Sequence, residues 1–256
     1  YKVLPWCPRC QTSLSSHEVA QGYKKIKESS IYLKVPVLWV EDPRYSGAKF
    51  LVWTTTPWTL PGNTALAVNP NFSYAIAEVK GEKLILAASR LKEVLGENFK
   101  IIDQIKGKDL AGIEYEPLFP ADKKSYQSKE IYTVVSAEFV SAEEGSGVVH
   151  IAPAFGEEDM TLSKKNNLAI LTTVDEEGKF ITPGYPWDKK FVKEGDILIT
   201  ENLKERNLFF KTELYEHDYP FCWRCDSPLL YYAKKAWWVA VTKVKKELLA
   251  NNQKIN

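Results

Sequence analysis

Four cysteines form two pairs of equal spacing near opposite ends of the 256-residue sequence. They are Cys7 with Cys10 and Cys222 with Cys225, and both segments read Pro-aromatic-Cys-x-Arg-Cys-x-hydroxyl-x-Leu. Two such turns supply the four soft ligands that Zn²⁺ binds at tetrahedral corners. The spacing predicts one zinc site formed by all four cysteines. Two unrelated turns with free thiols are the alternative.

Almost the whole chain separates the two pairs, whereas an ordinary zinc ribbon separates its halves by only about 15–20 residues. The simplest geometry is a stalk from which the chain departs and to which it returns. We therefore predict a zinc-bearing stalk in residues 1–30, a body in residues 31–215, and a returning stalk with a C-terminal helix in residues 216–256. His17 and His217 are alternative metal ligands. A zinc ribbon that binds nucleic acid directly is a further alternative, but such modules are strongly basic.

Three consecutive threonines follow an apolar strand and precede a proline-rich turn. Thr54, Thr55 and Thr56 offer hydroxyl and amide groups, and Pro57 and Pro61 stiffen the turn. Such a rigid rim suits the binding of a polar ligand or a water molecule. A threonine-rich strand followed by an ordinary turn is the alternative.

A second polar cluster occupies residues 145–159. A glycine turn leads into a short apolar strand that carries His150, and three acids, Glu157, Glu158 and Asp159, open a helix. The alternatives are a packed strand histidine and acids that complement the helix dipole. The sequence contains no convincing Ser-His-Asp triad and no phosphate-binding loop, which argues against acyl-enzyme chemistry and nucleotide hydrolysis.

Short strands dominate the elements that must position these clusters. Turn residues separate β-branched or alternating runs, at residues 31–40, 49–56, 65–68, 74–79, 83–87, 131–136 and 147–152. Helices are expected at 89–95, from about 157, at 195–206 and at 242–252. Regularly spaced short strands indicate a barrel-like or strongly curved sheet. The predicted class is β-rich α+β, with helices flanking the sheet.

The composition is that of a soluble globular protein. Hydrophobic residues make up 45% and charged residues 26%, and the net charge is +1. No apolar run is long enough to span a membrane, and no secretory signal begins the chain. We therefore expect a cytoplasmic monomer in a reducing compartment. The near-neutral charge indicates that any contact with nucleic acid is short, and the absence of an initiator methionine suggests a fragment.

Four motifs closely resemble the editing insertion (connective peptide 1) of isoleucyl-tRNA synthetases. They are WTTTPWTLPGNTALAVNP at 53–70, GSGVVHIAPAFGEEDM at 145–160, VDEEGKF at 174–180 and YPFCWRCDSPLLYYAKKAWWVAVT at 219–242. The opening LPWCPRCQTSLSSHEV at 4–19 is similar to the segment that enters that insertion. The valine and leucine enzymes typically carry Arg where Thr56 stands, and their second motif differs around His150.

The resemblance implies roles for the matching residues. Asp159 would hold the α-amino group of the substrate, and the threonines at 54, 55 and 56 would place the ester, the terminal ribose and the attacking water. His150 and Asn63 would bound the side-chain pocket. Apart from the resemblance, exposed single-stranded bases commonly stack on aromatic side chains, so Trp58 is expected to stack on the terminal adenosine. Simple packing over the threonine strand is the alternative. Catalysis is thus expected from Thr54, Thr55, Thr56 and Asp159.

The resemblance also implies a function, the hydrolysis of valine wrongly attached to isoleucine tRNA. An isoleucine pocket cannot strongly reject valine, and two-step selection is known for this family. The implied partners are the 3′ end of isoleucine tRNA carrying valine and the rest of a parent synthetase. The HIGH and KMSKS signatures are missing, so the ligase and ATP-binding activities of that family are not expected here. The alternatives are a non-catalytic, zinc-stapled insertion that binds the tRNA acceptor end, and the editing domain of the valine enzyme.

Overall fold

Strands make up most of the regular structure. The computed structural model describes residues 2–255 except 39, 40, 123, 125, 127, 128, 236 and 238. Its strands are β1 (Lys2–Cys7), β2 (Thr12–Ser13), β3 (Tyr23–Pro36), β4 (Ala48–Thr54), β5 (Ala65–Val68), β6 (Ser73–Val79), β7 (Glu82–Ala87), β8 (Lys100–Lys106), β9 (Thr133–Ser136), β10 (Val148–Ile151), β11 (Phe209–Pro220) and β12 (Leu230–Lys234).

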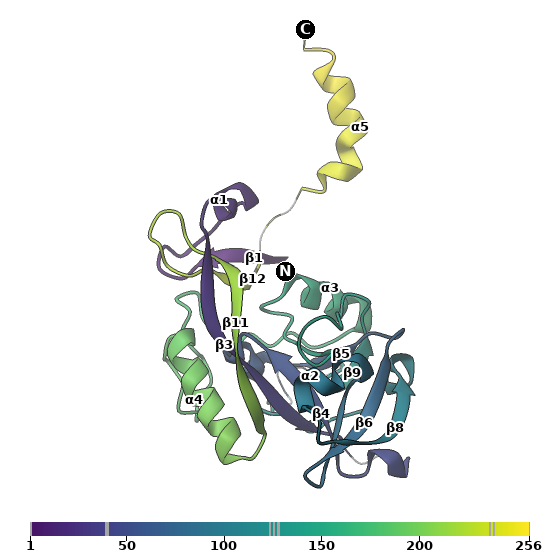
Figure 1. Ribbon diagram of the computed structural model, residues 1–256. Helices are drawn as coiled ribbons and strands as arrows, with labels where there is room; N and C mark the ends of the chain where they lie inside the picture. The colour runs from purple at the N-terminus through teal and green to yellow at the C-terminus, as the bar shows by residue number, and fades with distance from the viewer. Residues whose placement is uncertain are drawn as a thin grey trace.

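The helices are short and, except for α5, lie between or beside the strands (Figure 1). The α-helices are α1 (Ser16–Ala20), α2 (Leu91–Leu95), α3 (Glu157–Asn166), α4 (Val192–Glu205) and α5 (Val241–Asn252). The 3-10 helices are η1 (Pro43–Tyr45), η2 (Pro57–Gly62), η3 (Ala88–Arg90) and η4 (Gly107–Leu110). This is the β-rich α+β class that the sequence predicts.

One mixed sheet forms the body, and β4 lies at its centre. The strand order is β8-β6-β7-β4-β10-β5-β9, with β3 pairing β4 and β11 pairing β3. β4 runs parallel to β7 and β10 and antiparallel to β3. All four residues of β5 are buried, as expected for a strand covered on both faces.

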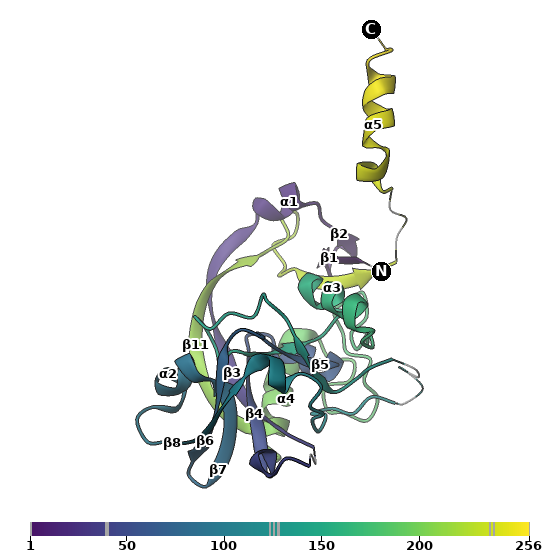
Figure 2. The ribbon, with the colours of Figure 1, turned by 90° about the vertical axis from the view of Figure 1, so that its right-hand side faces the viewer.

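β3 and β11 form a long curved ribbon that joins the body to the cysteine-bearing end of the molecule (Figure 2). Their antiparallel register runs from Leu33 opposite Phe209 to Tyr23 opposite Pro220. Both predicted domain boundaries, after residues 30 and 215, therefore fall inside continuous strands. At the far end, β1 pairs with β12 and β2 in a separate three-stranded sheet.

The predicted strands and the observed ones differ along this ribbon, and β1, β2, β8 and β12 were not among the predicted strands either. The strand expected at 31–40 begins already at Tyr23 and ends at Pro36, and residues 39 and 40 lie outside the described part of the chain. β11 was not predicted. Residues 23–30 and 211–218 carry mostly charged and polar side chains and are largely exposed. Backbone pairing between distant segments holds this ribbon, so neither strand shows the apolar alternation from which strands are predicted.

The body encloses its main core between the sheet and the segments that follow β8. The bulkiest fully buried side chains include Trp187, Tyr115 and Phe180. Trp187 stacks on Tyr185, with ring centroids 4.7 Å apart, and meets Phe119 edge to face at 5.2 Å. These aromatic contacts pack the non-helical segment before α4 against the segment between β8 and β9.

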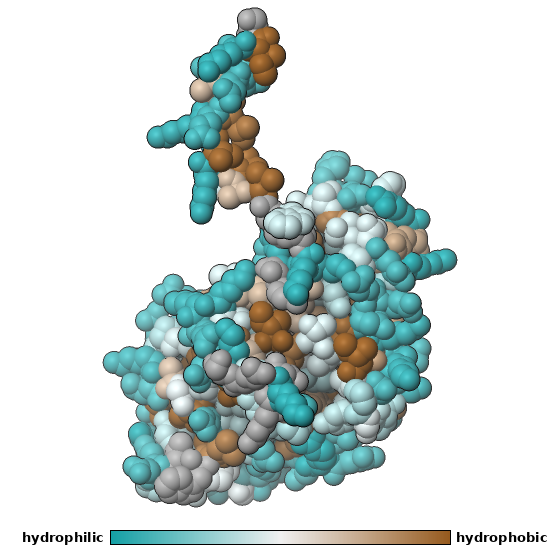
Figure 3. All heavy atoms as spheres, turned by 180° about the vertical axis from the view of Figure 1, so that it is seen from behind, coloured by the Kyte–Doolittle hydropathy of each residue, from teal (hydrophilic) through white to brown (hydrophobic). Residues whose placement is uncertain are grey.

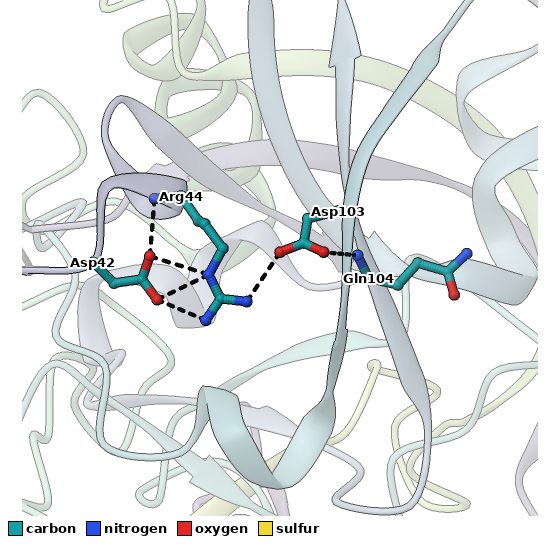
Figure 4. A network of polar contacts seen from close by, with 4 residues as sticks. All are labelled: Asp42, Arg44, Asp103 and Gln104. Carbon is teal, nitrogen blue, oxygen red and sulfur yellow. Dashed lines mark hydrogen bonds and ion pairs between the residues drawn. The ribbon is translucent and has the colours of Figure 1, made fainter.

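A surface ion-pair network ties the loop around η1 to β8 (Figure 4). Arg44 donates to both carboxylate oxygens of Asp42, and its Nη1 donates to Oδ2 of Asp103 at 2.9 Å. Oδ1 of Asp103 in turn accepts from the amide of Gln104 at 2.8 Å. Exposed pairs of this kind contribute little stability, so the network orders this loop more than it stabilises the fold.

The C-terminal helix α5 stands apart from the body in both ribbon views (Figures 1 and 2). None of its residues is buried, and Val241, Leu248 and Leu249 are each more than half exposed. Figure 3 shows apolar side chains open to solvent along this helix. Within the described residues, no helix is both long and apolar enough to cross a membrane.

Candidate functional site

The two polar clusters predicted from the sequence meet at one edge of the sheet. β4 and β10 are parallel neighbours, with Trp53 opposite Val149, so their carboxyl ends lie at the same edge. A pocket of about 230 Å³ opens there, and we call it the rim pocket. It is lined by Trp53, Thr54, Thr55, Thr56, Thr59, Val149, His150, Ala152, Phe155 and Asp159.

The threonine hydroxyls form a connected network along one side of the rim pocket. The backbone amide of Thr56 donates to Oγ1 of Thr54 at 3.1 Å. Oγ1 of Thr56 lies 3.5 Å from Oγ1 of Thr54 and 3.3 Å from Oγ1 of Thr59. The Thr59 hydroxyl donates to the carbonyl oxygen of Thr56 at 2.8 Å. The rim is thus held in one arrangement before any ligand arrives.

His150 is buried against this network. Its Nε2 lies 3.0 Å from Oγ1 of Thr59 and 3.4 Å from Oγ1 of Thr54. Because the Thr59 hydroxyl gives its proton to a carbonyl, Nε2 of His150 is the donor in this contact. No described residue pairs with Nδ1. Burial lowers the pKa of His150 to about 4, so the imidazole is neutral near pH 7 and a weak base.

Asp159 brings a carboxyl group to the same pocket from the first turn of α3. Its Oδ2 accepts a hydrogen bond from the backbone amide of Ala152 at 2.8 Å. Burial raises the pKa of Asp159 to about 6, although the Ala152 amide opposes the shift. Glu157 and Glu158, in the same turn, are exposed and do not line the rim pocket. Only one of the three predicted acids therefore reaches the site.

Asn63 and Trp58, both predicted to contact the substrate, turn away from the rim pocket. Nδ2 of Asn63 donates to the carbonyl of Ala65 at 2.9 Å, and its Oδ1 accepts from the Tyr115 hydroxyl at 2.6 Å. Trp58 is only 3% exposed and meets the Phe155 ring edge to face at 4.9 Å. Neither side chain lines the pocket, because both are needed in the core. This arrangement favours the packing alternative for Trp58 over base stacking.

The sequence did not single out several residues that line the pocket. Thr59 lies in the 3-10 helix η2, three residues after its N-cap residue Thr56, and the two hydroxyl oxygens lie 3.3 Å apart. Trp53 and Phe155 add apolar walls. A proline-rich sequence predicts a turn here but not a 3-10 helix, so local patterns contained no signal for Thr59.

The four cysteines come together as predicted. The sulfur atoms of Cys7, Cys10, Cys222 and Cys225 all lie within 4.8 Å of one another. A tetrahedral zinc site with Zn–S bonds of about 2.3 Å requires sulfur separations of about 3.8 Å, so the group is compact enough to hold a metal ion. His17 and His217 are not members of the group. His217 instead lies 3.6 Å from Glu28 on the ribbon.

Comparison with known proteins places the chain in a family. Residues 1–256 match the family described as tRNA synthetases class I (I, L, M and V). The chain therefore belongs to the class I tRNA synthetases of this group.

Within this family, the chain is similar to isoleucine–tRNA ligases. It is 47% identical to that of Clostridium novyi over 256 residues and 46% identical to that of Picrophilus torridus. The match to the Thermus thermophilus ligase is 44% identical. In each case it covers the whole chain but only 24% of the relative. The resemblance seen in the motifs is confirmed, and the chain spans about a quarter of these relatives.

Solved structures confirm the fold. GlLeuRS-CP1 matches with a TM-score of 0.58 and 14% identity, over 74% of this chain and all of that one. The P. knowlesi cytosolic leucyl-tRNA synthetase editing domain matches with a TM-score of 0.56 and 12% identity, over 76% of this chain and 98% of that one. The β-rich, curved architecture is thus that of synthetase editing domains.

The raised pKa of Asp159 predicts a pH-dependent change in stability. Since the folded pKa of about 6 exceeds the ordinary 3.8, the folded state binds the proton more tightly, and stability falls as pH rises from about 4 to 6. The Asp159→Asn side chain stays neutral at both pH values. We therefore expect the free energy of unfolding of this variant to exceed that of the wild type by on the order of 1–2 kcal/mol at pH 8 but not at pH 4. Urea unfolding at both pH values measures this. The exposed Glu157→Gln is the control, and an equal gain at both pH values would contradict the assignment.

The cysteine group predicts one bound zinc ion per chain. Elemental analysis of the purified protein should find about one equivalent, because four thiolates complete a structural site. Cys222→Ser should lose the metal and speed amide hydrogen exchange in β1 and β12 more than in β5 and β10. Zinc far below one equivalent, with all four thiols reactive, would show that the two turns are unrelated.

Proposed function

We propose that this chain hydrolyses the ester bond of valine wrongly attached to isoleucine tRNA. One observation carries the proposal: the threonine rim, His150 and Asp159 converge on a single small pocket. Because these residues are far apart in the sequence, it is the fold that brings them together. The similarity to isoleucine–tRNA ligases and to leucyl-tRNA synthetase editing domains supports the same activity.

The size and lining of the rim pocket suit a small aliphatic amino acid. Its volume of about 230 Å³ is below the ~300–1,000 Å³ typical of small-molecule sites. Val149, Ala152 and Phe155 give apolar contacts, and the neutral ring of His150 closes one side. A pocket of this kind accepts valine and excludes the additional methylene of isoleucine by steric clash. His150 therefore acts as a wall rather than a base.

The chemistry requires positioning more than a nucleophile. An aminoacyl ester is already activated, so water adds to its carbonyl carbon, the ester C–O bond breaks, and the products are free valine and a tRNA 3′ hydroxyl. The Thr54–Thr56 hydroxyls and the amides at the strand end can orient that water and stabilise the developing oxyanion. Asp159 accepts the substrate ammonium group in a charge-assisted hydrogen bond. The ammonium charge also counteracts the burial that raises the pKa of Asp159.

The partners belong to the proposal. The net charge of +1 supports only a weak grip on RNA phosphates, so a parent synthetase would supply most of the affinity for tRNA. Zinc at the four cysteines would act structurally, by joining the segment that leads into β3 to the segment that follows β11. A purely tRNA-binding insertion would need no carboxylate opposite a hydroxyl rim. The relatives, at 44–47% identity, favour isoleucine over the valine enzyme.

We expect the chain to deacylate valyl-tRNA of isoleucine specificity, at high protein concentration and low salt. Release of labelled valine from the charged tRNA measures the rate. Correctly charged isoleucyl-tRNA is the control and should remain intact. The chain should show no exchange of pyrophosphate into ATP with any amino acid. Binding of the charged tRNA without any release of valine would favour the non-catalytic alternative.

The variant His150→Ala distinguishes two possible roles of His150, as a wall of the pocket and as a general base. Removal of a wall should leave valine release substantial and increase isoleucine release by ~10-fold or more, as expected when a clash of about 1.4 kcal/mol is relieved. Removal of a base should instead slow valine release by ~10²-fold and leave isoleucyl-tRNA untouched. Both esters are assayed side by side, after circular dichroism has verified the fold. The second outcome would place His150 among the catalytic groups.

A further inference from the structure

A half-buried carboxyl group on helix α4 forms a hydrogen bond with the start of η2. Oδ1 of Asp196 accepts a hydrogen bond from the backbone amide of Trp58 at 2.7 Å. Trp58 is the second residue of η2, and Thr56, the N-cap residue, makes no side-chain capping bond. The first amides of a helix have no acceptor within it. Asp196 therefore caps η2 from a helix about 140 residues away in sequence.

We propose that Asp196 is a positioning residue for the rim pocket, holding η2 so that Thr56 and Thr59 face His150. The proposal rests on the proposed function. Asp196 does not line the rim pocket, so it acts through the backbone and not on the substrate. It lies instead in a neighbouring cavity of about 460 Å³, behind the rim.

The position of η2 allows the Asp196–Trp58 hydrogen bond to affect the rim pocket. η2 follows the Thr54–Thr56 rim directly and contains Thr59, whose hydroxyl bonds both the Thr56 carbonyl and the His150 ring. Thr55 borders both the rim pocket and the cavity behind it. A shift at the Trp58 amide would therefore move the hydroxyl network, and displacements of about 1 Å can lower rates by ~10²-fold.

Several charged or titratable groups surround the Asp196 carboxyl group. Lys193 lies one turn earlier on α4 and donates to Oε1 of Glu28, on β3, at 2.5 Å. Oε2 of Glu28 lies 3.6 Å from Nε2 of His217, on β11. Burial raises the pKa of Asp196 to about 7, and the nearby charge of Lys193 opposes this while that of Glu28 adds to it. Tyr219, also on β11, is the further titratable group on this side.

Three variants test the assignment. Asp196→Ala removes the acceptor, and Asp196→Asn keeps an oxygen in the same position. The control is Glu201→Ala, which removes an exposed carboxyl group from the same helix and from the border of the same cavity. Each is assayed for valine release, with kcat and KM separated, and for hydrogen exchange at the Trp58 amide.

We expect Asp196→Ala to lower kcat by ~10–100-fold with KM nearly unchanged, and to speed exchange of the Trp58 amide by at least tenfold. Asp196→Asn should restore slow exchange and most of kcat, and Glu201→Ala should match the wild type. If Asp196→Ala unfolds more easily but keeps kcat, or if Asp196→Asn is as impaired as Asp196→Ala, the positioning role is wrong. A wild-type protein without deacylation activity would refute the proposed function instead, and the exchange rates would still decide whether Asp196 holds η2.

Discussion

The site depends on the parallel pairing of β4 with β10. Because both strands run in the same direction, both end at one edge of the sheet, and Thr54 comes within 3.4 Å of His150 although 96 residues separate them. β5 runs antiparallel to β10, with Ala65 opposite Ile151, so it starts at that same edge. The segment from Thr55 to Thr64 must therefore leave and re-enter the sheet at one place. An antiparallel β4–β10 pair would put the threonines and the histidine at opposite ends.

Burial at this edge acts in opposite directions on the two titratable groups of the pocket. It lowers the pKa of His150 to about 4 and raises that of Asp159 to about 6, because a low-dielectric site favours the neutral form of each. The imidazole is therefore neutral near pH 7 and lies within hydrogen-bonding distance of the threonine hydroxyls. Under the proposed function, this neutral ring is the element that excludes isoleucine, and the Asp159 carboxylate is the element that binds the ammonium group. Burial thus acts on both groups from which the proposal derives its selectivity.

A series of contacts links the β3–β11 ribbon to α4 and α4 to the rim of the pocket. The β3–β11 ribbon carries Glu28, which pairs with Lys193 on α4, and α4 carries Asp196, which caps η2. The four cysteines gather beyond the end of the ribbon at which Tyr23 pairs with Pro220. Each contact joins segments far apart in sequence, so the rim of the pocket is set by long-range packing and not by the stiffness of its own turn alone.

The sequence by itself determined the local features. Apolar runs bounded by turn residues located β5, β6 and β7 to within one residue, and the repeated cysteine motif predicted the grouping of the four thiols. These features follow from backbone propensity and from the spacing of metal ligands, and both depend on residues that are close together in the sequence. The threonine cluster and the segment around His150 and Asp159 were also identified from their residue types.

Only the tertiary structure decided which side chains share the pocket. It added Thr59 and turned Asn63 toward Tyr115 and Trp58 into the core, whereas Asp159 was already identified by the resemblance. It also supplied Asp196, which no motif marks, and the ribbon strand β11, whose exposed residues show no apolar period. The direction of a side chain depends on elements that pack against it from distant parts of the chain. The hydrophobic periodicity of the sequence does not indicate those long-range contacts.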